Sequence, residues 1–155
     1  AAPGPFSAFA GVDRQIMLLD GDGVHLGAPG AGLDHRLDRR WRPFAFPGDA
    51  AVDCRLLGGS STDFNLMLRR GRWRGSVEVV RDARVPGSTP AGLCMVLAGR
   101  WRLGGDMLEP GQGLWWSAVG AGPALAPHAL QGGEAPVLAW VGLMPFLQEK
   151  NASSA

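Results

Sequence analysis

Asp63-Phe64-Asn65-Leu66-Met67-Leu68-Arg69-Arg70 is the strongest strand signal in this chain of 155 residues. Successive side chains of an extended strand point to opposite sides. One side is apolar and carries Phe64, Leu66 and Leu68. The other side carries an acid, an amide, a thioether and a guanidinium: Asp63, Asn65, Met67 and Arg69. We predict that the apolar side is core, and that the second side either faces solvent or lines a ligand pocket.

Four further segments precede this strand within the first 50 residues. They are Gly4-Pro5-Phe6-Ser7-Ala8-Phe9, Gly11-Val12-Asp13-Arg14, Leu18-Leu19-Asp20-Gly21-Asp22-Gly23 and Pro43-Phe44-Ala45-Phe46-Pro47-Gly48-Asp49. Taken in this order, the five segments resemble the HutD/Ves family of small bacterial proteins. The resemblance implies a cupin-type fold and a link to histidine utilisation.

The same resemblance bears on the start of the chain. Members of the family begin some tens of residues earlier, with a Trp-Lys-Asn-Gly-Gly-Gly segment followed by an acidic pocket residue. This chain opens at Ala1-Ala2-Pro3. We therefore expect an incomplete start and an open sheet edge or groove beside residues 5–9, with the aggregation risk that exposed edges carry.

Composition favours many short strands joined by tight turns, because 24 glycines and 12 prolines are dispersed between apolar segments. The formal net charge is only +1, and Asp34 and Asp38 dilute the basic stretch 36–42. That stretch is more typical of a solvated hairpin than of a nucleic-acid surface. No apolar stretch approaches the roughly 20 residues that cross a bilayer. We expect a cytoplasmic protein with no nucleic-acid or membrane partner, in which Cys54 and Cys94 are buried reduced thiols.

An internal duplication is visible in the turns. Leu18-Leu19-Asp20-Gly21 is echoed by Val96-Leu97-Ala98-Gly99, and Phe46-Pro47-Gly48-Asp49 by Glu109-Pro110-Gly111-Gln112. We predict an all-β fold, a cupin-like antiparallel β-sandwich or barrel with two related halves, hence bicupin-like. Residues 1–146 would form one domain, with halves at about 1–72 and 73–146, before a polar, disordered tail at 147–155.

The expected elements follow from alternation and turn residues. Strands are predicted at 6–10, 13–20, 23–27, 34–39, 43–46, 51–57, 62–69, 76–84, 93–99, 101–103, 114–119 and 136–143. The only helical signal is a single turn at 144–150. Phe44 and Phe46 share a face and are expected to cover the barrel mouth.

Metal and cofactor sites are not indicated. Metal-dependent cupins use two histidines one residue apart, a nearby glutamate and a later histidine, a set that suits transition metals. His25, His35 and His128 lack this spacing, although His25 and His35 could face each other across a hairpin. We predict that the protein uses no metal and no cofactor.

The candidate ligand-binding residues are Asn65, Asp63, Met67, Arg14, Ser7 and Phe64. An arginine fork and an amide are suited to a carboxylate, and the family resemblance makes N-formyl-glutamate the natural example.

The first hypothesis is a non-enzymatic protein that binds a small anionic metabolite to sense or regulate histidine catabolism, with a homodimer as one allowed assembly. The alternative is a metal-free isomerase, epimerase or lyase with Asp63 as carboxylate base, paired with Asp13. A structural role for Asp13, in which it pairs with an arginine to fix a turn, is the favoured explanation of that residue.

Overall fold

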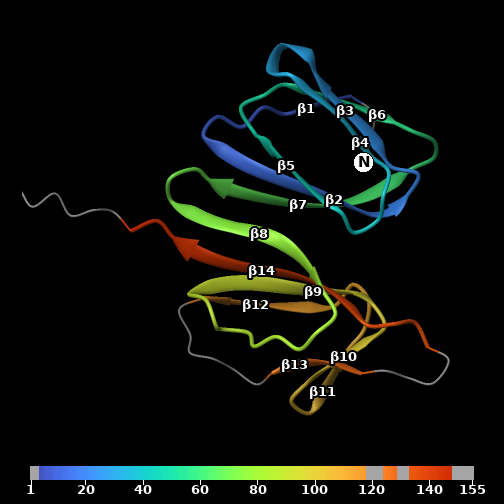
Figure 1. Cartoon of the computed structure of the whole chain (residues 1–155), viewed down its shortest axis with the longest axis vertical. Helices are drawn as coiled ribbons and strands as arrows, with labels where there is room; N and C mark the ends of the chain where they lie inside the picture. Colours follow the sequence, from blue (N-terminus) through green and yellow to red (C-terminus); the bar gives the residue numbers. More distant parts are fainter. Residues whose placement is uncertain (1–3, 118–123, 129–132, 148–155) are drawn as a thin grey trace, which may run out of the picture.

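The structure, a computed structural model, describes residues 4–117, 124–128 and 133–147. These residues form antiparallel β-strands and one 3-10 turn, with no α-helix among them (Figure 1). The first strands are β1 (Gly4–Phe6), β2 (Val12–Gly21), β3 (Val24–Ala28), β4 (Leu33–Leu37), β5 (Pro43–Pro47), β6 (Val52–Leu56) and β7 (Ser61–Arg69). They are followed by β8 (Trp73–Val80), β9 (Ala91–Ala98), β10 (Arg100–Leu103), β11 (Asp106–Leu108), β12 (Gly113–Ser117), β13 (Leu125–His128) and β14 (Val137–Pro145).

Four sheets stack face to face along the long axis of the molecule (Figure 1). The strand orders are β1-β6-β3-β4, β5-β2-β7, β12-β9-β14-β8 and β11-β10-β13. A separate apolar cluster fills each of the three spaces between neighbouring sheets. Two sandwiches, one built from β1–β7 and one from β8–β14, therefore share a third core where they meet.

The two sandwiches repeat one topology. In the first, β2 lies between β5 and β7 while β3 lies between β4 and β6. In the second, β9 lies between β12 and β14 while β10 lies between β11 and β13. The all-β fold with two related halves is thus confirmed. The duplicated turn at Gly21 and Gly99 marks corresponding corners, at the ends of β2 and β9, whereas the Pro-Gly turns do not correspond, because one follows β5 and the other precedes β12.

The shared core joins the halves through apolar contacts and one polar clamp. Met17, Leu66 and Leu68 of the first half pack against Val77 and the neighbouring strand β14. The Gln15 side chain donates to the carbonyl of Gly75 at 3.0 Å and accepts from the amide of Val77 at 2.9 Å. Such a side chain satisfies two backbone groups that the junction would otherwise bury unpaired.

Several predicted boundaries were wrong. The first strand lies at Gly4–Phe6 rather than 6–10, and β11 and β13 were not predicted. These strands are three or four residues long, too short to show alternation, and β13 contains Pro127, a residue that sequence patterns count against a strand. The helical turn predicted at 144–150 is not formed at Met144–Pro145, which end β14, and residues 146–147 are irregular. The rest of that prediction, and most of the predicted tail, lie outside the described residues.

Cys54 and Cys94 are free and buried, one in the core of each sandwich, as the sequence predicted. Burial raises the pKa of both thiols, because the thiolate form is poorly solvated there. Within the described ranges, no helix is long and apolar enough to cross a bilayer.

Candidate functional site

A buried arginine organises the candidate site. Arg14 lies on β2, is 5% exposed, and its side chain shares a sheet face with those of Ile16 and Leu18, which belong to the core of the first sandwich. Its Nη2 donates to Oδ1 of Asn65 on β7 at 2.9 Å. The β2–β7 register creates this contact, since Arg14 lies opposite Met67 and Ile16 lies opposite Asn65.

Three aromatic rings surround the guanidinium. Its central carbon lies 5.0 Å from the ring centroid of Phe46, 5.1 Å from that of Phe6 and 5.7 Å from that of Phe9. Ring faces attract cations, so these contacts stabilise a largely buried charge. We call Arg14, Asn65, Phe6, Phe9 and Phe46 the Arg14 cluster.

The cluster holds positive charge with little compensation. Burial lowers the pKa of Arg14, because the charged guanidinium is desolvated. Within the described part of the chain, Nε of Arg14 has no hydrogen-bond partner, and the ion pairs there form among other side chains. A buried cation of this kind is costly unless an anion or further acceptors approach it.

Two other predicted residues lie on the same face of β7 as Asn65. Met67 is 41% exposed, so this end of the sheet is open to solvent. Asp63 is half-buried beside Leu18 of β2, and burial raises the pKa of its carboxyl. Of the predicted polar side of the strand, Asn65 contacts Arg14, Met67 lies opposite Arg14, and Asp63 lies further along the sheet opposite Leu18.

Two predicted site residues fall outside the cluster. Phe64 points to the opposite face of β7 and packs in the core between the two halves, as period-two alternation requires. Ser7 is exposed in the irregular segment after β1, between Phe6 and Phe9. The two phenylalanines, rather than the serine, approach Arg14. Their place in the segment Gly4-Pro5-Phe6-Ser7-Ala8-Phe9 was the sequence feature that could have identified them.

The corresponding position of the second half is filled with apolar groups. Gly92 of β9 pairs with Trp116 and Gly142, where Arg14 pairs with Phe46 and Met67. The Trp116 ring occupies the space above Gly92 and would clash with any side chain there. Trp140 stands where Asn65 stands in the first half, with its ring centroid 4.8 Å from that of Trp116. The charged cluster thus belongs to one half only.

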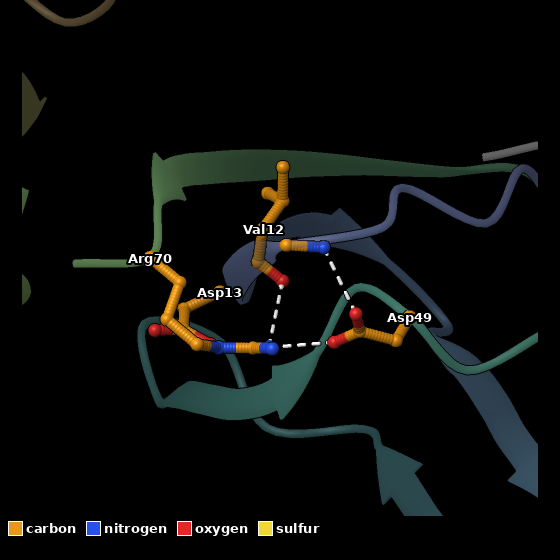
Figure 2. A network of polar contacts seen from close by, with 5 residues as sticks. Val12, Asp13, Asp49 and Arg70 are labelled. Carbon is orange, nitrogen blue, oxygen red and sulfur yellow. Dashed lines mark hydrogen bonds and ion pairs between the residues drawn. The ribbon is translucent and has the colours of Figure 1, made fainter. Parts of the chain in front are cut away.

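A second polar network fixes the end of the cluster (Figure 2). The Arg70 guanidinium donates to Asp13 at 2.8 Å and to Asp49 at 2.6 Å, while Asp49 accepts from the amide of Gly11 at 2.9 Å. The hydrogen bonds from Arg70 and Gly11 lower the pKa of Asp49 to about 2. Three segments distant in sequence are tied together immediately before Arg14.

This network settles the role of Asp13. Its carboxylate pairs with Arg70 at the surface and points away from the face that carries Asp63, since Asp13 lies opposite Leu68. The hypothesis of an Asp13–Asp63 acid–base pair is therefore wrong, and the structural role is confirmed. Sequence reasoning did not identify Arg70, because Arg69 and Arg70 are equally plausible partners at the end of a strand.

The histidines do not form a joint site. His25 contacts Asp34 on the outer face of the first sheet, whereas His35 stacks on Phe44 with ring centroids 3.6 Å apart. They do not face each other, because His25 lies opposite Arg36 and His35 opposite Leu26. Among the described residues, no group of three or more potential ligands could hold a metal ion.

Two open hollows lie on the surface of the first half and at its junction with the second. One cavity of about 430 Å³ lies on the outer face of β3, β4 and β6 and is lined by His25, Asp34, Asp53 and Arg55, among others. A second of about 430 Å³ lies along the groove between the halves, where Arg14 and Phe46 meet Trp73 and Phe146. Arg14 is thus at the boundary of a hollow, while Asn65 and Met67 form an open face.

Comparison with known proteins identifies the family. The HutD family model matches residues 1–134, and the chain belongs to this family. Protein Ves of Cronobacter sakazakii is 42% identical over 117 residues, covering 75% of this chain and 64% of that protein. Protein Ves of Citrobacter koseri is 38% identical, with 75% and 60% covered. The chain therefore spans about 60–64% of the length of these curated relatives.

Two solved structures share the fold. HutD from Pseudomonas fluorescens SBW25, solved in a formate condition, superposes with a TM-score of 0.74 at 25% identity, covering 92% of this chain and 73% of that one. A conserved protein of unknown function from Pseudomonas aeruginosa PAO1 gives the same TM-score at 27% identity, with 92% and 77% covered.

Proposed function

We propose that this protein is a non-enzymatic binding protein that holds a small anionic metabolite at the Arg14 cluster. The main observation behind this proposal is the burial of Arg14, which is 5% exposed. Among the described residues, its guanidinium is hydrogen-bonded only to the neutral amide of Asn65. An incoming carboxylate would supply the missing negative charge. Charge-assisted hydrogen bonds of this kind are shorter and about twice as strong as neutral ones.

The surroundings suit an organic carboxylate better than a bare inorganic ion. Phe6, Phe9 and Phe46 provide apolar surface around the guanidinium, so a ligand with a short carbon chain gains contact area as well as charge. The Asn65 amide can rotate to offer its N–H donors to a second oxygen. A carboxylate with an adjacent carbonyl or amide matches this pair of groups.

N-formyl-glutamate is our specific candidate within that class. It carries two carboxylates and a formyl amide, and HutD family membership supports a role in sensing or regulating histidine catabolism. Formate, the condition in which the Pseudomonas fluorescens HutD structure was obtained, is the smallest carboxylate and the simplest probe. We place the protein in the cytoplasm, where such intermediates occur.

Isothermal titration calorimetry of N-formyl-glutamate, glutamate and formate tests this proposal. We expect saturable binding, and Asn65→Ala should weaken it by about 1–3 kcal/mol, the usual penalty for leaving a buried polar partner unpaired. Ser76→Ala is the matched control, because Ser76 is an exposed strand residue of the second half. Equal affinity in wild type and Asn65→Ala would show that the anion binds elsewhere.

One observation favours a second candidate. Burial raises the pKa of Asp63, which moves a carboxyl towards the range of a general base or acid. A metal-free isomerase, epimerase or lyase would use such a group next to a carboxylate held by Arg14. Proton NMR of the incubated ligands distinguishes the two cases: conversion or solvent-deuterium exchange that is lost in Asp63→Asn supports the enzyme, and binding without change supports the sensor.

A further inference from the structure

The free edge of β12 differs from the other sheet edges in the described residues. Exposed edge strands normally carry charges or prolines that discourage pairing with another chain. Proline occurs in β1, β5 and β13, and charged residues occur in β4, β7, β8 and β11. The sequence of β12, Gly113-Leu114-Trp115-Trp116-Ser117, contains neither. It pairs with β9 on one side only.

The middle residue of this edge is an exposed tryptophan. Trp115 is 76% exposed, whereas its neighbour Trp116 is 6% exposed in the core of the second sandwich. Leu114 also packs on that core. An indole left in water at the centre of an unprotected strand is unusual, because tryptophan is among the residues most enriched at protein interfaces.

The backbone of β12 is arranged for pairing at its outer side. The amide of Val96 donates to the carbonyl of Gln112 at 2.8 Å, which fixes where the ladder begins. In an antiparallel ladder the hydrogen-bonding direction alternates along the strand. The backbone groups of Leu114 and Trp116 therefore point to β9, and those of Gly113, Trp115 and Ser117 point outward.

We propose that β12 is a self-association edge, at which a second copy of this chain pairs antiparallel about a two-fold axis through Trp115. Gly113 of one copy then lies opposite Ser117 of the other, and the two Trp115 residues exchange N–H and C=O hydrogen bonds. Both indoles project from the same face of the joined sheet and contact each other. The two four-stranded sheets become one continuous sheet across the dimer.

The choice of a second copy rests on charge. A two-fold axis brings each residue near its own twin, so a charged strand would oppose like charges, which is destabilising. Of the described edges, β12 alone avoids both this repulsion and the loss of a donor at proline. A heterologous partner strand could present the opposite charge, so it would not require an uncharged edge.

The contact area sets the expected strength. A five-residue strand pair with two indoles is smaller than the roughly 1,200 Å² at which stable interfaces begin, so the dimer is a weak one. We expect a dissociation constant of about 10–100 μM. Anion binding at the Arg14 cluster, in the other sandwich, is independent of it.

Sedimentation velocity of the full chain from about 1 to 500 μM tests the proposal. We expect a concentration-dependent monomer–dimer equilibrium in wild type. Trp115→Lys and Trp115→Glu should each be monomeric, because either places like charges on the axis. An equimolar mixture of the two should regain the dimer, since only then do opposite charges meet. Circular dichroism checks that each variant is folded.

Leu147→Lys is the matched control, because Leu147 is 91% exposed outside the strands and the change adds the same charge. It should leave the equilibrium unchanged. Ser117→Pro provides a second route, since it removes an outward-pointing donor without altering Trp115, and it should also give monomers. A monomeric wild type, a dimer that survives Trp115→Lys, or a mixture that fails to re-associate would each overturn the proposal.

Discussion

The substitution Asn65→Asp is the most direct test of the Arg14 cluster. The two side chains have almost the same size, and Oδ1 of Asn65 already accepts from Nη2 of Arg14 at 2.9 Å. The variant therefore places a carboxylate on an existing hydrogen bond without adding volume. If Arg14 lacks a counter-ion, the protein should become more stable and should bind anions more weakly.

The expected gain follows from the position of the two groups. Two unit charges 4 Å apart gain about 4 kcal/mol at an effective dielectric constant of about 20 and about 1 kcal/mol in water. Asn65 is exposed and Arg14 is buried, so the interaction lies between these limits. After desolvation of the new carboxylate, we expect a net gain of about 1–2 kcal/mol at pH 7. That corresponds to a rise in Tm of about 2–8 °C.

The gain should depend on pH in one direction. The neighbouring guanidinium lowers the pKa of the introduced carboxyl in the folded protein below its unfolded value of about 3.9. The additional stability is then fully present above about pH 4 and is lost as the pH falls through the lower, folded pKa. Urea unfolding of both proteins between about pH 2 and pH 8 measures this difference directly.

Ser76→Asp is a matched control that adds the same charge at an exposed strand position of the second half. It should change the free energy of unfolding by no more than about 0.5 kcal/mol. Calorimetry with formate and N-formyl-glutamate should show at least a tenfold loss of affinity in Asn65→Asp. Stability at or below wild type at pH 7 would refute the argument that Arg14 lacks a counter-ion, and unchanged affinity would refute Arg14 as the anion site.

Two other predictions concern the contacts that hold the site in place. Hydrogen bonds from Arg70 and Gly11 lower the pKa of Asp49 to about 2, so the wild type should lose stability as the pH falls from about 4 towards 2. Asp49→Asn should reduce this loss of stability at low pH, as followed by circular dichroism. An unchanged loss in the variant would contradict the role given to Asp49. Gln15→Leu leaves the Gly75 carbonyl and the Val77 amide unpaired at the junction of the halves. Urea unfolding should show that the free energy of unfolding falls by about 2–4 kcal/mol. A loss below about 0.5 kcal/mol would mean that water replaces the hydrogen bonds of Gln15.

Local patterns in the sequence predicted the strands of the fold well and its contacts poorly. Alternation along 62–69 correctly separated the core side of β7 from the side that carries Asp63 and Asn65. Glycine turns located the corners of both halves, since Gly21 and Gly99 adopt positive φ angles that other residues resist. The short strands β11 and β13 were not predicted, because three or four positions define no clear period.

The candidate site depends on register, which the sequence does not encode locally. Arg14 and Asn65 are 51 positions apart, and they meet because β2 and β7 pair in a register that places Arg14 opposite Met67 and Ile16 opposite Asn65. A one-residue slip would move Arg14 opposite a residue of the other face. The aromatic rings around Arg14 also come from distant segments, Phe6 and Phe9 from the start of the chain and Phe46 from β5. The sequence shows where these phenylalanines are, but not that all three contact the same guanidinium.

The duplicated architecture explains why one half can carry such a site. Both halves share the order of six strands, β2–β7 and β9–β14, yet the second fills the position of Arg14 with the Trp116 ring above Gly92 and the position of Asn65 with Trp140. The sandwich therefore does not need a cation at this place, because an apolar filling satisfies the same topology. A buried guanidinium costs stability unless it is compensated, and its presence in the first half is more readily explained by binding than by folding. For the same reason we expect anion binding to follow changes in the first half and to be insensitive to repacking of the tryptophans in the second.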